Sequence, residues 1–459
     1  TTLTLGESGD TVTLGTGASQ SGFGRAGSVD WVTTPVTSTP TTGVSGKGYF
    51  VNSTGAIKTI NLPASPSAGD IMAVVDYAGT AGSYNITVGR NGSNINGAAS
   101  DQTISKENSG ATFVYVDGTQ GWKFTETSNV SDIELQPTYI EATGGTITTS
   151  GNFKVHTFTG PGTFEVTTLG NPIGSTTVDY LVVAGGGSGG SSGAPGAAGG
   201  GGAGGFRLSN SVGCIPAPTM SPLANPSGLP VAVSSYPITV GAGAASSSTN
   251  TGCKGANSVF STITSTGGGF GGSFAAGNRN AGPGGSGGGA AGGSDSPAGV
   301  SGTIGAGNTP SVSPAQGNNG GLGTNTNPQP GPYYWNGGGG GGAGAVGASG
   351  VPGSASAGGV GSFVSPSMAG CKGTTGPVPS VRYFAGGGGG GSQGPGQPND
   401  NVGVGGAGGG SNGTLCSPNA SSAGTVNTGG GSGGNGGNTT PNVSGTGGSG
   451  IVIIRYKFQ

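Results

Sequence analysis

The chain has 459 residues, of which 112 are glycine and only 7% are charged. Its formal net charge of −2 hides an asymmetry, since residues 1–180 hold seven basic and fourteen acidic residues, whereas 181–459 hold seven basic and two acidic ones. Such sparse charge excludes a polybasic surface, and no apolar run approaches the ~20 residues that span a bilayer. We therefore expect no nucleic-acid partner and no membrane insertion.

The first 35 residues predict short strands rather than a compact domain. Threonine and apolar residues follow one another over 2–5 and 11–14, with turn residues between the two runs. Strand pairs this short are marginally stable alone and gain stability when several copies wind together. We therefore predict an N-terminal β-shaft or attachment segment over 1–35, through which the protein forms a homotrimer or joins a partner.

Residues 36–128 predict a small β-module. Strand-like runs recur at short intervals and are separated by turn residues: 48–51, 59–62, 71–77, 86–88 and 112–116. Strands at this spacing are typical of an all-β fold. Trp31 and Trp122 flank the module, and we expect them to pack its ends, because large aromatic side chains dominate small cores.

Five sequence segments follow one another in the first 125 residues: GRAGSVDW, GKGYFVNSTGAI, LPASPSAGDIMAVVDYAGT, NITVGRNGSNINGAASD and VYVDGTQGW. Together they resemble the β-module of tail fibres and other structural proteins of tailed phages, especially those of marine cyanobacteria. The resemblance implies that the N-terminal region attaches the protein to other virion structural proteins.

A polar stretch over 129–139 is the predicted linker. Beyond it come further strand-like runs, and the chain ends in a strongly apolar one: 146–148, 153–158, 163–166, 178–184 and 451–456. A terminal strand of such apolarity is expected to be paired and buried, with the earlier strands as its partners. We therefore predict that 140–459 is one domain, in which a β-sandwich-like scaffold holds a glycine-rich insertion.

Glycine supplies 85 of the residues from 181 onward, so this body must be built from backbone. Collagen needs glycine at every third position, a rule that AAGGGGAGGF at 197–206 breaks. A flexible linker is the alternative, but the word Gly-Cys-Lys-Gly at 252–255 recurs at 370–373, which favours a folded, repetitive body. Polyglycine II helices fit this composition, because they lack internal hydrogen bonds and near-absent side chains let neighbouring backbones bond in every direction.

The second half also carries a resemblance, in the words VHTFTGPGTFEV, DYLVVAGGG, YPITVGAGA, NSVFSTITSTGGG and GSGIVIIRY. They resemble the glycine-rich domains of phage fibres and related surface proteins, in which loops at a distal tip recognise the host surface. The resemblance implies a protein of the virion surface that binds a bacterial surface protein or glycan. A purely architectural appendage of capsid or tail, without a receptor, is the alternative left open.

Three segments between glycine runs concentrate arginine and aromatic residues, the types that anchor binding patches. They are 276–280 with Arg279, 331–336 with Tyr333, Tyr334 and Trp335, and 380–384 with Arg382, Tyr383 and Phe384. These are the candidate receptor-binding loops. The alternative is that the same side chains cover the glycine helices and supply apolar burial that glycine lacks.

The sequence offers little for catalysis or metal binding. His156 is the sole histidine and lies in a strand-like run, so we expect a structural role, and Asp295 and Asp400 are the only acids after residue 180. We therefore predict no enzyme activity, cofactor or metal, and rank a glycan depolymerase low, because glycan cleavage needs two neighbouring carboxylates. Four cysteines permit two disulfides. Spacing favours Cys214 with Cys253 and Cys371 with Cys416, but three connectivities stay open.

Overall fold

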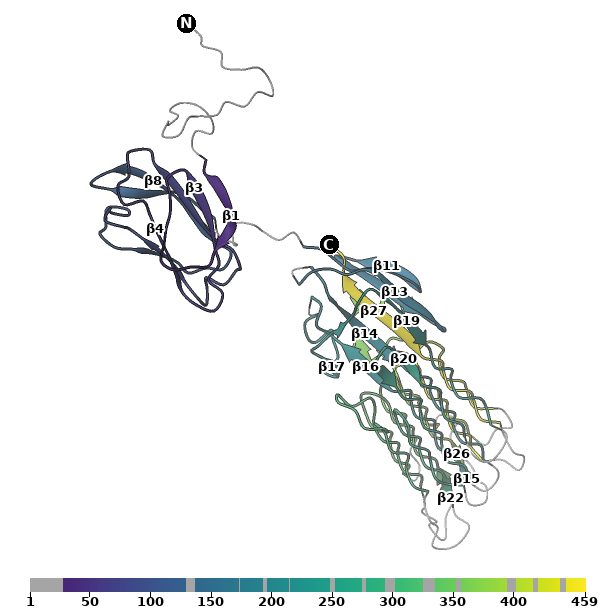
Figure 1. Cartoon of the computed structure of the whole chain (residues 1–459). Coiled ribbons are helices and arrows are strands. Elements are labelled where there is room, and N and C mark those ends of the chain that lie inside the picture. The colour runs from purple at the N-terminus through teal and green to yellow at the C-terminus, as the bar shows by residue number, and fades with distance from the viewer. Residues whose placement is uncertain are drawn as a thin grey trace, which may run out of the picture. The chain divides into compact units, whose positions relative to one another are not determined.

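The computed structural model describes thirteen stretches of the chain, which form two compact units, Thr1–Leu135 and Gln136–Gln459 (Figure 1). The described residues are 28–128, 137–172, 174–192, 196–213, 215–247, 252–274, 278–293, 302–324, 335–351, 356–393, 402–415, 420–437 and 443–459. Apart from the four-residue helix α1 (Pro366–Ala369), their regular elements are all strands. The predicted all-β class is therefore confirmed, while the runs expected at 2–5 and 11–14 lie outside the described residues.

The first unit is built from two facing sheets. One has the order β1 (Asp30–Val36), β3 (Lys47–Val51), β5 (Ile71–Asp76), β8 (Gly110–Asp117) and β9 (Gly121–Ser128), and the other β2 (Thr41–Thr42), β4 (Lys58–Asn61), β6 (Ile86–Gly89) and β7 (Gln102–Ile104). The chain alternates between the sheets, so β1, β3 and β5 are parallel, and so are β2, β4 and β6. A strand of one sheet thus serves as the crossover that parallel strands of the other require.

An apolar core fills the space between these sheets, with Val51, Ile60, Met72, Phe113 and Trp122 fully buried. Trp122 has no exposed surface and packs against Tyr115, whereas Trp31 is 40% exposed and lies against Phe50. Because β1 starts at Asp30, the module begins before the expected boundary at residue 36.

The second unit has a β-sandwich scaffold. One sheet has the order β10 (Glu141–Thr143), β13 (Gly162–Thr168), β19 (Ser234–Thr239), β20 (Ser258–Phe260) and β21 (Ile263–Ser265). The other has the order β11 (Thr146–Ser150), β12 (Phe153–Phe158), β27 (Ile451–Lys457), β14 (Thr177–Val183), β16 (Phe206–Ser209) and β17 (Ala224–Asn225), with β18 (Leu229–Pro230) beside β14. The C-terminal strand is therefore paired and buried between two earlier strands, as predicted.

Strands β14 and β27 lie in the middle of three layers. Val182 and Ile454 face the first sheet, in a cluster with Phe164 and Phe260, whereas Leu181 and Ile453 face a cover that includes α1. Burial on both faces explains why these two strands are continuous apolar runs rather than alternating ones.

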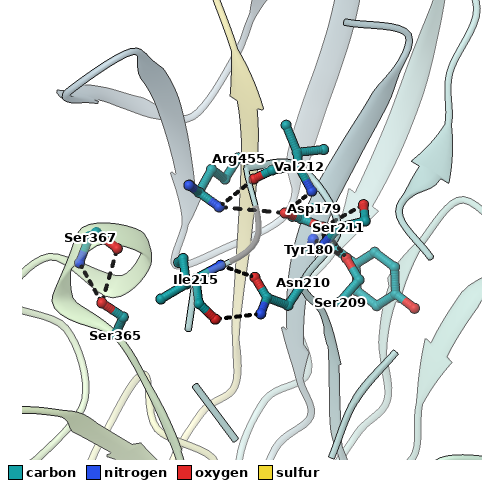
Figure 2. Close-up of polar contacts among 10 residues, drawn as sticks. All are labelled: Asp179, Tyr180, Ser209, Asn210, Ser211, Val212, Ile215, Ser365, Ser367 and Arg455. Atoms are coloured by element: carbon teal, nitrogen blue, oxygen red, sulfur yellow. Dashed lines mark hydrogen bonds and ion pairs between the residues drawn. The ribbon is translucent and has the colours of Figure 1, made fainter. Parts of the chain in front are cut away.

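A buried ion pair connects the two central strands on the covered face (Figure 2). The Arg455 guanidinium lies 3.5 Å from the Asp179 carboxylate, and both side chains are almost fully buried. Asp179 also accepts hydrogen bonds from the backbone N–H groups of Ser211 and Val212 and from the hydroxyls of Ser209 and Ser211. The pair therefore fixes the turn after β16 against the C-terminal strand.

His156 is a buried structural residue of β12. Its Nδ1 lies 2.7 Å from the Gly144 carbonyl oxygen, to which it must donate, so Nε2 accepts from the Tyr456 hydroxyl at 3.1 Å. Desolvation lowers the pKa of His156 below 6.5, and Lys154 adds a smaller repulsion. Burial also raises the pKa of Tyr456 to about 12, so this hydroxyl keeps its proton.

We expect the free energy of unfolding to fall as the pH drops below about 6.5, because the unfolded state binds a proton on His156 more readily than the folded state. Melting temperatures measured from about pH 8 to about pH 5 should show this loss in the native protein. A His156→Phe variant should be less stable throughout but have a shallower pH dependence. Equal slopes for the two proteins would contradict this role of the histidine.

Glycine-rich segments leave the scaffold strands and run back and forth as a bundle of extended helices (Figure 1). The segment 198–205 is the axis of the bundle, and every one of its residues is buried. Its backbone bonds to six other segments, and neighbours in this ring also bond to each other: 187–190, 266–272, 286–290, 338–341, 386–391 and 429–435.

The hydrogen bonds recur at every third residue. Gly199, Gly202 and Gly205 donate in turn to Gly272, Gly269 and Thr266 of one antiparallel neighbour, at 2.8–2.9 Å. Three residues per turn, with all bonds made to neighbours, are the properties of polyglycine II, so this prediction is confirmed.

Close packing explains why these positions are glycine. A Cβ atom on Gly199 would lie 1.8 Å from the Gly289 carbonyl oxygen, and one on Gly340 would lie 2.0 Å from the Gly201 carbonyl oxygen. Since the obstructing atoms are backbone, no side-chain rotation could make room.

Candidate functional site

The end of the bundle farthest from the scaffold is the candidate site (Figure 1). Two short strand pairs lie there, β15 (Gly196–Ala197) with β22 (Gly292–Gly293), and β23 (Trp335–Asn336) with β26 (Ser392–Gln393). Ala197 also forms a bridge with Gly436, and the Phe274 ring lies against Gly196 and Gly293. The described chain enters or leaves several intervals beside this frame, among them 193–195, 275–277, 294–301, 325–334, 394–401 and 438–442.

Small buried polar side chains hold these chain ends in place. The Ser392 hydroxyl donates to Asn336 Oδ1 at 2.6 Å, and Asn336 Nδ2 donates to the Val351 carbonyl at 2.8 Å. The Ser192 hydroxyl donates to the Gly196 carbonyl, which joins the two sides of 193–195. The end of the bundle is therefore a fixed frame, and the intervals differ from one another in sequence.

The described residues of the first two candidate loops, 278–280 and 335–336, lie at this far end of the bundle. Arg279 is partly buried, with its guanidinium 4.7 Å from the centre of the Phe274 ring. Trp335 is only 9% exposed and forms part of β23, so it packs within the frame rather than presenting a binding surface. Tyr333 and Tyr334 lie outside the described residues, and their proposed role stays a prediction.

The third candidate loop lies at the opposite end of the bundle. Its residues Arg382–Phe384 form β25, which pairs with β24 (Ser362–Val364). Phe384 is fully buried in one cluster with Val183 and Ile451, and Tyr383 is 4% exposed. Tyr383 and Phe384 therefore cover the scaffold, which is the packing alternative left open for these loops, while Arg382 is partly exposed.

Comparison with known families agrees with this architecture. The profile of a family described as a glycine-rich domain matches residues 157–457. The chain belongs to the glycine-rich domain family. No curated protein matches the chain. The matched region of the glycine-rich domain begins within β12 and ends with β27, so it contains the whole bundle and most of the scaffold.

The cysteines of the glycine-rich domain do not settle the disulfide pattern. Cys253 and Cys371 are exposed and are not bonded to each other, Cys253 in a bundle segment and Cys371 just after α1. Cys214 and Cys416 lie outside the described residues, so the predicted pairing stays a prediction.

Two cavities lie away from the candidate site. One of about 250 Å³ in the first unit is bordered by Lys106 and Phe124, and one of about 440 Å³ in the glycine-rich domain lies between β11 and the segment 366–372. The residues that line them include no histidine, aspartate or glutamate. Neither cavity therefore supplies the pair of carboxylates that glycan cleavage needs.

No helix among the described residues has the length and apolarity to cross a membrane, and within the same part of the chain no three His, Cys, Asp or Glu side chains gather as a metal site.

Proposed function

We propose that the protein is a non-enzymatic adhesin of a phage virion, whose glycine-rich domain presents the intervals at its far end to the bacterial surface. The observation that carries the proposal is the convergence of the boundaries of these intervals on one hydrogen-bonded frame. A rigid frame lowers the entropy lost when a receptor binds, which favours affinity.

The composition of the intervals supports the same proposal. They hold the residue pairs Tyr333-Tyr334 and Asn399-Asp400, the acid Asp295 and several prolines, whereas the bundle segments are mostly glycine, alanine and serine. Aromatic and polar side chains of this kind are typical of recognition surfaces. A bacterial surface protein or a glycan is the expected partner.

The remaining parts have supporting roles in this proposal. Residues 1–35 and the first unit would attach the protein to other virion structural proteins and hold three copies together, with the glycine-rich domains outside the particle. The N-terminal resemblance to structural proteins of tailed phages supports this arrangement.

Binding of fluorescently labelled protein to intact bacteria, cyanobacteria foremost, tests the proposal. We expect saturable, strain-selective binding that weakens about tenfold or more when Tyr333 and Tyr334 are both changed to serine. Trp335 is left unchanged because it is buried. The matched control changes Tyr77 and Tyr84 of the first unit, which are 54% and 40% exposed.

Equal losses in both double variants would contradict recognition at Tyr333 and Tyr334. Absence of binding to every strain, including one that the parent phage infects, would favour the architectural appendage instead.

A further inference from the structure

Five exposed aliphatic side chains stand on neighbouring segments of the bundle. Ile304, Leu322, Val346, Val351 and Val404 are 36–62% exposed, and we call them the aliphatic side. They stand on segments that are otherwise built from small residues, where serine or asparagine would fit the same open space.

Hydrogen bonds show that the segments carrying these residues follow one another in the bundle, although they lie far apart in the sequence. Gly320 donates to Gly305, next to Ile304, and Gly350 donates to the Leu322 carbonyl at 2.7 Å. Next in the series, Ala348 donates to Ala357 and Gly358 donates to the Val404 carbonyl at 2.8 Å. The series of segments is therefore continuous from the first aliphatic residue to the last: 302–308, 316–324, 345–351, 356–361 and 402–407.

These segments carry no charged residue. Exposed apolar side chains on neighbouring segments are typical of an interaction site. The partner surface must itself be apolar and free of unpaired charge, because burying a lone charge is costly. The aliphatic side of another copy meets both conditions.

We propose that the glycine-rich domains of neighbouring copies pack side by side through the aliphatic side. Association through this surface would hold the far ends of several bundles together, so that their intervals face the same target. The inference does not depend on what the intervals recognise.

Site-specific photo-crosslinking of the full-length protein tests this contact. A benzoylphenylalanine probe at Val346 should give products between copies, and mass spectrometry should join it to residues of the aliphatic-side segments. The same probe at Ala256, exposed on a segment outside the series, is the control. A yield at Val346 no higher than at Ala256 would overturn the proposal, even if the protein is oligomeric through its N-terminal region.

Sedimentation analysis gives a second readout. Changing Leu322, Val346 and Val404 together to serine should raise the dissociation constant between copies about tenfold or more, with the melting temperature nearly unchanged. The matched control changes Val44, Val116 and Val233, which are 46–61% exposed and lie outside the bundle. An unchanged dissociation constant in the aliphatic-side variant would contradict the proposal.

Discussion

A Gly199→Ala change should destabilise the glycine-rich domain by about 3 kcal/mol or more. The new methyl group would lie 1.8 Å from the Gly289 carbonyl oxygen, in a segment that is itself bonded on all sides. Relief would require the axis and its ring to separate, which breaks several backbone hydrogen bonds at once. Calorimetry should show this loss in the transition of the second unit, with that of the first unit unchanged.

The control for this experiment is Gly160→Ala in the same unit. No atom lies within 4 Å of the Cβ position at Gly160, so we expect a change of no more than about 0.5 kcal/mol. Similar melting temperatures for the two alanine variants would contradict the close-packed bundle.

An Asp179→Ala change should also be severe, with an expected loss of about 3–5 kcal/mol. It would leave the Arg455 guanidinium buried without its counter-ion and remove the acceptor for the turn after β16. Chemical unfolding of the variant measures the loss. The control is Asp30→Ala, because the Asp30 carboxylate is 74% exposed and pairs with Lys47. This change should alter the free energy of unfolding by less than about 1 kcal/mol.

The double variant Asp179→Leu with Arg455→Met separates charge burial from packing. Because neither side chain then carries a charge, it should be more stable than Asp179→Ala. A double variant as unstable as the single one would show that the hydrogen bonds of the turn, rather than the unpaired guanidinium, account for the loss.

The scaffold could be predicted from the sequence because its strands have apolar side chains in recognisable patterns. The apolar run at 451–456 predicted a buried terminal strand, and the structure places it between β12 and β14. The alternation of the chain between the two sheets of the first unit could not be predicted. Short strands separated by turns have the same sequence pattern whether consecutive strands pair as a hairpin or alternate between two sheets.

The polyglycine II conformation could also be predicted, but the neighbours of each segment could not. Gly199 bonds to Gly272 and Gly202 to Gly269, yet nothing distinguishes these glycines from others in the sequence. Without side chains, the pairing is determined by where each segment leaves the scaffold.

The candidate site was predicted only in part. Tyr383 and Phe384 stand directly before a glycine run, as Leu181 to Val183 do, and both runs are strands that enter the bundle from the scaffold. The aromatic residues at 383–384 predicted a binding loop. Their position directly before a long glycine run is the signal that indicates a buried strand.

Hydrogen exchange of the backbone amides, followed by mass spectrometry under native conditions, tests most directly whether the glycine-rich body is a hydrogen-bonded bundle. We expect the amides of 198–205, 337–342 and 386–391 to be as strongly protected as those of β27, because each set is buried and bonded to neighbouring backbone. Exchange of the three glycine segments at the rate of an unstructured chain, with β27 still protected, would contradict the bundle.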